Sequence, residues 1–428
     1  MFKTIQEALN QGSGKVSIRG WVYRERKMKN FCFLVMRDGS NIVQCIVEKD
    51  KVTPEEWEAV NKILVESSCE ITGNIVEDKR APTGFEIKTE KLNVVQFADV
   101  FPITKDQSTE LLLDVRHLWI RSRQLTAIFK IKSTVLEASR EFFKKEGYYE
   151  VTPPIITGSS CEGGSTLFEI NYFKQKAFLS QSAQLYQESL IFSLDKVYAI
   201  TPSFRAEPSK TSRHLTEYWH LEPEAAWITY EELQQLTENL ISYICLKVAE
   251  RNPEELKQVG RDPADLKKMV PPFPRMTYDD ALKLLKQDGM EVEWGKDLRT
   301  LEEEQLMKHY DKPLLVLKYP KSIKAFYMKE DPENHDVVQC FDVLAPEGHG
   351  EIVGGSMREE NYESVKQRLI QQGENPEHYT WYLDLRKYGS VPHGGFGMGI
   401  ERVVKWICKL DNIRDTIPYP RTINRSTP

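Results

Sequence analysis

The sequence predicts an α+β protein with two domains, a small β-barrel followed by a larger domain in which an antiparallel sheet is flanked by helices. Residues 16–97 contain five short segments with the period-two alternation of strands, whereas later segments mix strands and long helices without a regular strand–helix–strand rhythm. The length of 428 residues suits two or three domains. We expect the barrel at 1–98, a hinge at 99–115 and the larger domain at 116–428.

Five strands and one helix make up the first domain. Alternating apolar residues indicate the strands, with further strands near 69–76 and 85–96, and the helix is expected near 54–65. The alternating residues of the first three strands are Val16, Ile18 and Val22, then Phe31, Phe33 and Val35, then Val43, Cys45 and Val47. Five strands in fewer than about 100 residues favour a closed barrel of the OB type. Another small β domain fits the same alternation.

The larger domain opens with a strong helix. Apolar residues at steps of three and four form one stripe, Ile128, Ile131, Val135, Ala138 and Phe142, and Gly147 stands where the helix should end. The polar stretch 251–274 predicts a surface excursion, and Thr277 with Asp280 predicts a helix N-cap. Strands are expected near 335–344 and 350–357, and a helix after the turn GGFGMG.

Composition excludes several classes of protein. Apolar residues make up 40% and charged residues 29%, which is ordinary for a globular chain, and the net charge of −6 argues against a protein that coats nucleic acid. The seven cysteines are odd in number and lack a CxxC pair, so neither a disulfide framework nor a zinc site is expected. No signal peptide or membrane span of about 18 apolar residues is visible, and we expect a cytoplasmic chain without membrane contact.

Three clusters of residues are candidates for a functional site. Arg205, Glu207, Arg213 and His214 lie between two predicted strands and suit a polyanion, since arginine binds phosphate through two donors at once; a hairpin with surface ion pairs fits as well. Arg402 follows the glycine-rich turn 394–399 on the first turn of a helix, where its guanidinium could stack on an aromatic base.

The third cluster is a pair of acids. Asp342 and Glu351 stand nine residues apart on two predicted neighbouring strands. Carboxylate oxygens suit Mg²⁺, which also bridges phosphates. Two solvated carboxylates at a sheet edge are the plainer interpretation of the same pattern.

These clusters, in this order, resemble the signature motifs of the class II aminoacyl-tRNA synthetases. GYYEVTPPII, with Pro154, is similar to motif 1, FRAEPSKTSRHLTEYWHLEPE to motif 2, and GGFGMGIERVVKWICKLDNIRDTIPYPR to motif 3. With the barrel, the resemblance covers nearly the whole chain and points to subclass IIb, the aspartyl, asparaginyl and lysyl enzymes, with the asparaginyl group, in its archaeal-like form, the most similar. It implies a homodimer built partly on motif 1, and ATP and Mg²⁺ as substrate and cofactor.

The resemblance also assigns roles around ATP. Arg205 is expected to hold the α-phosphate and Glu207 the adenine amino group, Arg213 and His214 the outer phosphates, Tyr218 and Arg402 the two adenine faces, and Asp342 and Glu351 the Mg²⁺ ions. Arg205 and Arg402 are the expected catalytic residues. Attack of a carboxylate on phosphorus needs positioning and charge neutralisation rather than a protein nucleophile.

The same resemblance predicts the amino acid. The expected contacts to the α-amino group are Glu162, Ser182 and Gln184, and Arg358 is expected to meet a side-chain oxygen. Gln187 stands where the aspartyl enzymes typically carry lysine, and Glu222 where they carry aspartate; both changes disfavour a substrate carboxylate. The prediction is therefore an enzyme that charges tRNA(Asn) with asparagine.

In the barrel, the resemblance assigns Arg24, Phe33 and Gln44 to the anticodon. An aromatic face and a nearby amide suit single-stranded RNA, whose splayed bases stack and offer their edges. A place for Phe33 in the barrel core is the alternative.

Three other functions remain open at this level. One is charging with aspartate, including relaxed charging of both tRNAs. Another is synthesis of asparagine from adenylated aspartate and ammonia by a synthetase-like enzyme, against which the barrel counts because such enzymes lack it. The third is a non-catalytic tRNA-binding protein, although such proteins usually lose motif residues that are present here.

Overall fold

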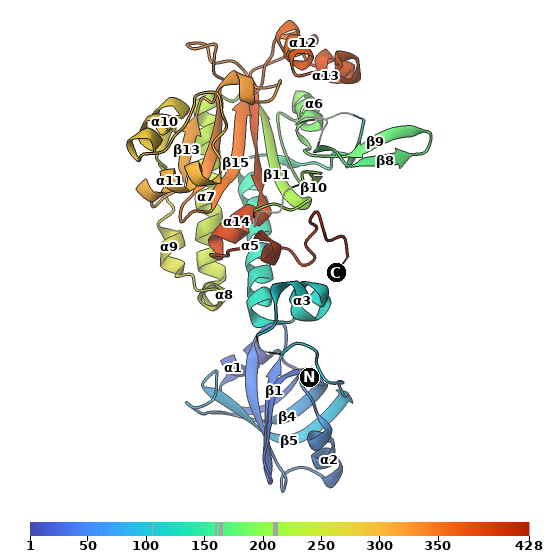
Figure 1. Cartoon of the computed structure of the whole chain (residues 1–428). Helices are drawn as coiled ribbons and strands as arrows, with labels where there is room; N and C mark the ends of the chain where they lie inside the picture. The colour runs from blue at the N-terminus through green and yellow to red at the C-terminus, as the bar shows by residue number, and fades with distance from the viewer. Residues whose placement is uncertain (105, 159–160, 162–165, 209–212, 428) are drawn as a thin grey trace. The chain divides into compact units, whose positions relative to one another are not determined.

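The computed structural model describes residues 1–104, 106–158, 161, 166–208 and 213–427. The chain forms two compact units, Met1–Asp114 and Val115–Pro428 (Figure 1). Within the described residues, no helix is both long and apolar enough to cross a membrane.

The first unit is a closed barrel of five strands. Its elements are α1 (Ile5–Gln11), β1 (Gly14–Lys27), β2 (Phe31–Arg37), β3 (Ile42–Glu48), α2 (Pro54–Lys62), β4 (Ser68–Glu77), β5 (Phe85–Gln96) and α3 (Thr109–Asp114). The barrel closes in the order β1–β2–β3–β5–β4, with β3 and β5 parallel and all other pairs antiparallel. This confirms the predicted OB-type barrel. Helix α3 lies inside the stretch that was expected to be a hinge.

The barrel core follows the alternation of the sequence, except that the buried side of β2 is the opposite of the expected one. In β1 and β3 the apolar residues named above are buried, as expected. In β2 the core is filled instead by Cys32, Leu34 and Met36, each without exposed surface. Phe31 and Phe33 therefore lie on the outer side of the strand, where their rings meet edge to face at 5.3 Å.

The second unit is built around an eight-stranded sheet. Its helices and strands are α4 (Arg116–Trp119), α5 (Arg123–Lys145), β6 (Tyr149–Glu150), β7 (Ile156–Thr157), β8 (Glu169–Tyr172), β9 (Gln175–Leu179), α6 (Gln184–Leu194), β10 (Lys196–Phe204), β11 (Glu217–Ala226), α7 (Tyr230–Arg251), α8 (Pro253–Gln258), α9 (Pro263–Lys267), β12 (Arg275–Thr277), α10 (Tyr278–Gln287), α11 (Thr300–Leu306), β13 (Leu314–Leu317), β14 (Cys340–Ala345), β15 (Gly350–Met357), α12 (Tyr362–Gln371), α13 (Thr380–Asp384), β16 (His393–Gly399) and α14 (Ile400–Ile407).

The strand order is β12–β13–β14–β15–β16–β11–β10–β6, and β7, β9 and β8 form a separate small sheet. The six inner strands of the large sheet are antiparallel, as expected, whereas both edge strands join parallel to their neighbours. The predicted antiparallel sheet is thus a mixed sheet at its edges, because the chain passes through helices between β6 and β10 and between β12 and β13, and such crossovers bring the second strand back parallel to the first.

Long helices cover this sheet. The predicted apolar stripe of α5 is buried, and α5 packs beside α7 in one core with residues of the sheet and α14 (Figure 1). Gly147 follows the end of α5 with φ of 80°, a conformation that glycine adopts without a steric penalty. Thr277 caps α10 by accepting a hydrogen bond from the backbone N–H of Asp280.

The stretch 251–274 is not the surface excursion that its polarity predicted. It contains α8 and α9, whose Leu256 and Leu266 belong to the main core. Buried Arg261 donates to the carbonyl oxygens of Trp406 (2.6 Å) and Ile407 (3.0 Å) at the end of α14. The prediction failed because each of the two short helices buries a single apolar residue, so the sequence shows no periodicity there.

Candidate functional site

Two adjoining cavities open on the sheet of the second unit. The first has a cavity volume of about 80 Å³. Its lining comes from the β10–β11 hairpin, from β15 and from the junction of β16 with α14, including Glu207, His214, Tyr218 and Arg402. The second is lined from α6, β11, β14, β15 and the segment 322–328. Both cavities share Arg205, His220, Glu351 and Gly397.

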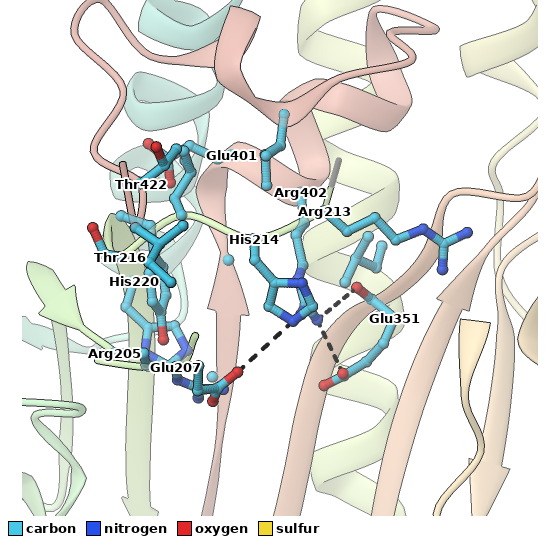
Figure 2. Close-up of a pocket in the computed structure, with 17 residues that line it drawn as sticks. Arg205, Glu207, Arg213, His214, Thr216, His220, Glu351, Glu401, Arg402 and Thr422 are labelled. Atoms are coloured by element: carbon cyan, nitrogen blue, oxygen red, sulfur yellow. Dashed lines mark hydrogen bonds and ion pairs between the residues drawn. The ribbon is translucent and has the colours of Figure 1, made fainter. Parts of the chain in front are cut away.

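Arg205 lies at the junction because β10 ends one residue earlier. Strands β10 and β11 pair as far as Phe204 and Glu217, and the Arg205 N–H then donates to the carbonyl oxygen of Thr216 at 3.0 Å. The Arg205 guanidinium stands 5.7 Å from the centre of the Tyr218 ring. The hairpin therefore presents a cation and an aromatic face together; Arg205 is labelled in Figure 2.

Arg402 enters the same cavity from the first turn of α14. Its Nη1 donates to the side chain of Glu351 at 2.9 Å and to the backbone carbonyl of Glu351 at 3.0 Å (Figure 2). Burial raises the pKa of Glu351, but Arg402 and Lys324 outweigh burial, so the net pKa lies below its usual value. The acid is therefore an anion at neutral pH, and the structure brings the two predicted arginines and Glu351 around one space.

The other residues of the predicted polyanion cluster divide into two groups. Glu207 and His214 face each other, with Oε2 and Nε2 3.9 Å apart (Figure 2). Burial and Arg402 lower the pKa of His214. The guanidinium of Arg213 points away from Arg205 and Glu207 (Figure 2).

Arg213 is held by the other side of the cavity. It donates to Glu303 (3.1 Å) and Glu304 (2.6 Å) of α11 and to the carbonyl oxygen of Gly348 (2.6 Å). Burial and Glu351 raise the pKa of Glu303 to about 7. Sequence patterns gave no sign of these partners, because α11 lies about ninety residues away and its charges look like those of any solvated helix.

The two acids stand on paired strands. Asp342 of β14 is opposite Gly354 of β15, three residues from Glu351. A Cβ atom placed on Gly354 would lie 3.2 Å from Oε1 of Glu351 and 3.4 Å from Oδ1 of Asp342. Two carboxylate oxygens thus face one space above a residue without a side chain. Oxygen donors around such a cradle fit Mg²⁺.

Asp342 has a cationic partner that the sequence did not reveal. Its Oδ2 accepts a hydrogen bond from Nζ of Lys324 at 2.8 Å, and both side chains are largely buried. Burial raises the pKa of Asp342 to about 6 because, together with the nearby charge of Glu351, it outweighs Lys324. Lys324 belongs to an irregular segment, where a single lysine carries no recognisable pattern.

A second cluster of potential ligands is already neutralised by arginines. Carboxylate oxygens of Glu188 and Glu224 and a ring nitrogen of His393 lie within 4.8 Å of one another. However, Glu188 pairs with Arg386 at 2.6 Å and Glu224 pairs with Arg358 through two bonds of 2.9 and 3.0 Å. The two guanidinium charges balance the two acids, so the cluster has no need of a metal ion.

Buried polar groups line the second cavity. The Ser182 hydroxyl donates to Glu222, whose other oxygen accepts from the N–H of Ala183 at 2.9 Å. Burial raises the pKa of Glu222. Gln187 donates its Nε2 to the backbone carbonyl of Glu222 at 2.6 Å, which fixes the orientation of the amide. Its buried Oε1 has no hydrogen-bond partner among the described residues.

Gln184 and Arg358 complete the wall. Gln184 donates to Glu188 at 3.0 Å, and Nη1 of Arg358 donates to Ser356 at 2.7 Å. The structure thus brings Ser182, Gln184, Gln187, Glu222 and Arg358 around one cavity. Glu162, which was predicted to contribute here, lies outside the described residues.

A separate polar surface occupies the outer side of the barrel. Across β1, β2 and β3, Arg24 is opposite Val35 and Val35 is opposite Gln44, while Arg26 is opposite Phe33. Phe33 is only half-buried on this side, so the alternative that places it in the barrel core is wrong. Gln44 donates to Glu86 of β5 at 2.6 Å.

Comparisons with known proteins agree with this arrangement. Residues 108–423 match the family model of the class II tRNA synthetases (D, K and N), and residues 16–95 match the OB-fold nucleic acid binding domain. An asparagine–tRNA ligase of Thermoplasma acidophilum is 50% identical over 97% of this chain and 96% of its own length.

Solved structures give the same result. The asparaginyl-tRNA synthetase of Pyrococcus horikoshii in complex with asparaginyl-adenylate has a TM-score of 0.97 and 47% identity, with all of both chains covered. The aspartyl-tRNA synthetase of Entamoeba histolytica is more distant, with a TM-score of 0.86, 27% identity, and coverage of 100% of this chain and 93% of its own. This chain belongs to the class II aminoacyl-tRNA synthetases of the aspartyl, lysyl and asparaginyl group.

Proposed function

We propose that this protein is an asparagine–tRNA ligase. It joins asparagine to ATP as asparaginyl-adenylate, with release of pyrophosphate, and transfers the asparaginyl group to the 3′ end of tRNA(Asn) in the cytoplasm. The observation that carries the proposal is the position of Arg205 at the junction of the two cavities. There, one guanidinium reaches both the nucleotide and the amino acid whose carboxylate attacks the α-phosphate.

The first cavity is the proposed nucleotide site. Arg205 holds the α-phosphate, Glu207 accepts a hydrogen bond from the adenine amino group, and Tyr218 and Arg402 cover the two faces of the adenine ring. His214 and Arg213 meet the outer phosphates, which for Arg213 requires an exchange of Glu303 and Glu304 for phosphate oxygens. A triphosphate offers a larger charge to Arg213 than two carboxylates do, and this favours the exchange.

Asp342 and Glu351 would hold Mg²⁺ in the proposed site. Their converging oxygens above Gly354 support this assignment. When bound there, Mg²⁺ would neutralise part of the charge of the phosphates. The chain itself aligns the reacting carboxylate with the α-phosphate and supplies Arg205 for the developing charge, which is the type of contribution that accelerates such a transfer.

The second cavity is the proposed asparagine site. Ser182 and Gln184, with Glu162, receive the α-amino group, and Arg358 donates to the side-chain oxygen. Gln187 supports asparagine over aspartate, since its unpartnered Oε1 can accept an N–H of the substrate amide but would be left facing an oxygen of a carboxylate. Buried Glu222 adds repulsion against a carboxylate in the same place.

The outer side of the barrel is the proposed anticodon site. Arg24, Phe33 and Gln44 lie in neighbouring rows of three strands, which supports stacking of a base on Phe33 and reading of its edge by Gln44. We assign this role to 1–98 and the chemistry to 116–428, with 99–115 as the connection.

We also propose a homodimer that uses motif 1. The segment around Pro154 exposes Tyr149, Ile155 and Ile156 by 59%, 39% and 44%, and such neighbouring apolar side chains are typical of an interface. Sedimentation of the purified protein is expected to give twice the mass of one chain, and Ile156→Glu is expected to shift the protein toward the monomer.

ATP–pyrophosphate exchange with asparagine and aspartate in parallel tests the function. Asparagine is expected to support exchange in the absence of tRNA, and aspartate at least about 10⁴-fold less, because a mismatched buried polar group discriminates strongly. Exchange with aspartate alone would mean charging with aspartate, and exchange with neither would favour a non-catalytic protein. The barrel and the relatives that are about half identical over nearly the whole chain argue against an asparagine synthetase.

A further inference from the structure

Lys324 is a buried cation in the second cavity that the roles above leave without a use. Its side chain is 13% exposed, and its Nζ lies 2.8 Å from Oδ2 of Asp342. The same nitrogen stands 3.9 Å from the centre of the Tyr319 ring and 4.0 Å from Oδ1 of Asp297. The ring face attracts the ammonium and holds it beside Asp342.

The two proposed metal-binding acids are held alike, each by one cation. Glu351 gives Oε2 to Arg402, and Asp342 gives Oδ2 to Lys324. The remaining oxygens, Oε1 of Glu351 and Oδ1 of Asp342, are the two that approach the empty Cβ position of Gly354. Each cation thus occupies the outer oxygen of one carboxylate and turns the inner oxygen toward the shared space.

This arrangement has a physical reason. Two carboxylates that are close together in a poorly solvated cavity repel each other, and either can rotate or take up a proton to relieve the repulsion. A fixed hydrogen-bond donor on the outer oxygen opposes both the rotation and the protonation of the carboxylate. Partners of this kind commonly orient the ligands of a metal, and their loss typically weakens metal binding by 10- to 100-fold.

We propose that Lys324 is a positioning residue for Asp342, holding Oδ2 so that Oδ1 faces, together with Oε1 of Glu351, the place of the Mg²⁺ that accompanies ATP. This inference rests on the proposed function of the same site. It differs from a role as an ordinary ion pair, which would leave metal binding unchanged, and from competition with the metal, in which loss of Lys324 would tighten binding.

Binding of Mn²⁺ in the presence of ATP and without asparagine separates these roles, since free Mn²⁺ can be counted by electron paramagnetic resonance. Lys324→Met is expected to weaken Mn²⁺ binding about tenfold. Lys324→Arg keeps a cationic donor and is expected to recover most of the affinity. Lys321→Met is the matched control, because Lys321 lies three residues earlier and pairs with Glu330 outside the cavity.

A second measurement uses the reaction. In asparagine-dependent exchange, Lys324→Met is expected to raise the Mg²⁺ concentration at half-maximal rate about tenfold and to leave KM for asparagine within about twofold. A purely structural role would change KM and rate without this selective shift. Thermal unfolding by circular dichroism checks the fold, and Lys324→Gln, which keeps a neutral donor, replaces the methionine variant if that variant unfolds.

Folded Lys324→Met or Lys324→Gln protein that binds Mn²⁺ as tightly as the wild type, or more tightly, would overturn the inference. Failure of the proposed function has a different signature, which is a wild-type protein without asparagine-dependent exchange. In that case the Mn²⁺ measurement with ATP still decides the role of Lys324.

Discussion

At the scale of single residues, Arg205 is the cation on which the proposed chemistry depends most. Arg205→Ala removes the contact to the α-phosphate and is expected to lower the rate of ATP–pyrophosphate exchange by about 10²- to 10³-fold, as loss of a group that stabilises developing charge commonly does. The fold should remain, because Arg205 lines two cavities rather than the core. Exchange that persists within tenfold of the wild type, in protein with an unchanged melting curve, would remove Arg205 from the mechanism.

Glu188 has the opposite character, a buried charge that serves the fold. It has no exposed surface and accepts hydrogen bonds from Arg386, Tyr382, His393 and Gln184. Glu188→Gln leaves Arg386 without its balancing charge, and loss of one partner from a buried pair costs about 3–5 kcal/mol. The urea midpoint of the second unit should fall accordingly. Glu254→Gln, which removes an exposed pair with Lys257, is the control and should change it little.

The same residue predicts the pH dependence of stability. Burial alone would raise the pKa of Glu188, but Arg386 and His393 outweigh burial and hold the pKa well below its usual value of 4.5. The folded-state pKa is thus below the unfolded-state pKa, so the contribution of Glu188 is present above about pH 4.5 and is lost as the pH falls through the lower folded value. Wild-type protein should lose stability below pH 4.5 more steeply than Glu188→Gln.

Residues that belong to a local motif were predictable, and residues that act through distant contacts were not. Arg205, Arg402 and Glu351 stand in short segments whose composition points to phosphate or metal chemistry, and they meet in one cavity as expected. Lys324, Glu188 and Glu303 pair with oppositely charged side chains that lie between 18 and 205 positions away, and the sequence around each is that of an ordinary charged residue.

At the scale of elements, α11 controls the state of Arg213. Glu304 is 42% exposed and holds Arg213 at 2.6 Å, so it would compete for Arg213 with the outer phosphates that we propose this arginine binds. Glu304→Gln weakens this competition and is expected to lower KM for ATP by up to about fivefold, since a partly exposed pair is worth about 0.2–1 kcal/mol. Glu293→Gln, which removes only a surface pair with Lys296, is the control. An increase in KM would instead mean that α11 holds Arg213 in place for the nucleotide.

Helices and strands whose apolar pattern repeats over many residues were also predictable. Helix α5 repeats its apolar stripe over 23 residues and was expected from the sequence alone. Helices α8 and α9 have six and five residues, and the edge strands β6 and β12 two and three. Segments this short gain their structure from the core that they pack against, so their own sequence does not define them.

At the scale of the whole molecule, the order of the motifs was more informative than any one of them. The glycine-rich turn before Arg402 is by itself weak evidence, and so is the pair Asp342 and Glu351. Their joint order with the hairpin of Arg205 predicted the fold and the family. In the barrel, the period-two pattern predicted the strands. Both sides of β2 are apolar, however, so the pattern alone did not decide whether Phe33 faces the core or the outer side.

The division into two units predicts that anticodon reading and chemistry separate by mutation. Gln44 lies in the first unit, while every lining residue of the two cavities belongs to the second. Gln44→Ala removes a donor and acceptor that we assign to a base edge, a loss of about 1.4 kcal/mol or tenfold in kcat/KM for tRNA(Asn). ATP–pyrophosphate exchange without tRNA should stay at the wild-type rate, because no group in the cavities has changed.

Gln96→Ala, at the exposed end of β5 opposite Ser68, is the matched control and should leave both reactions unchanged. If Gln44→Ala slows exchange as much as charging, the barrel stabilises the enzyme rather than reads the anticodon; if it slows neither, the base lies elsewhere on the barrel.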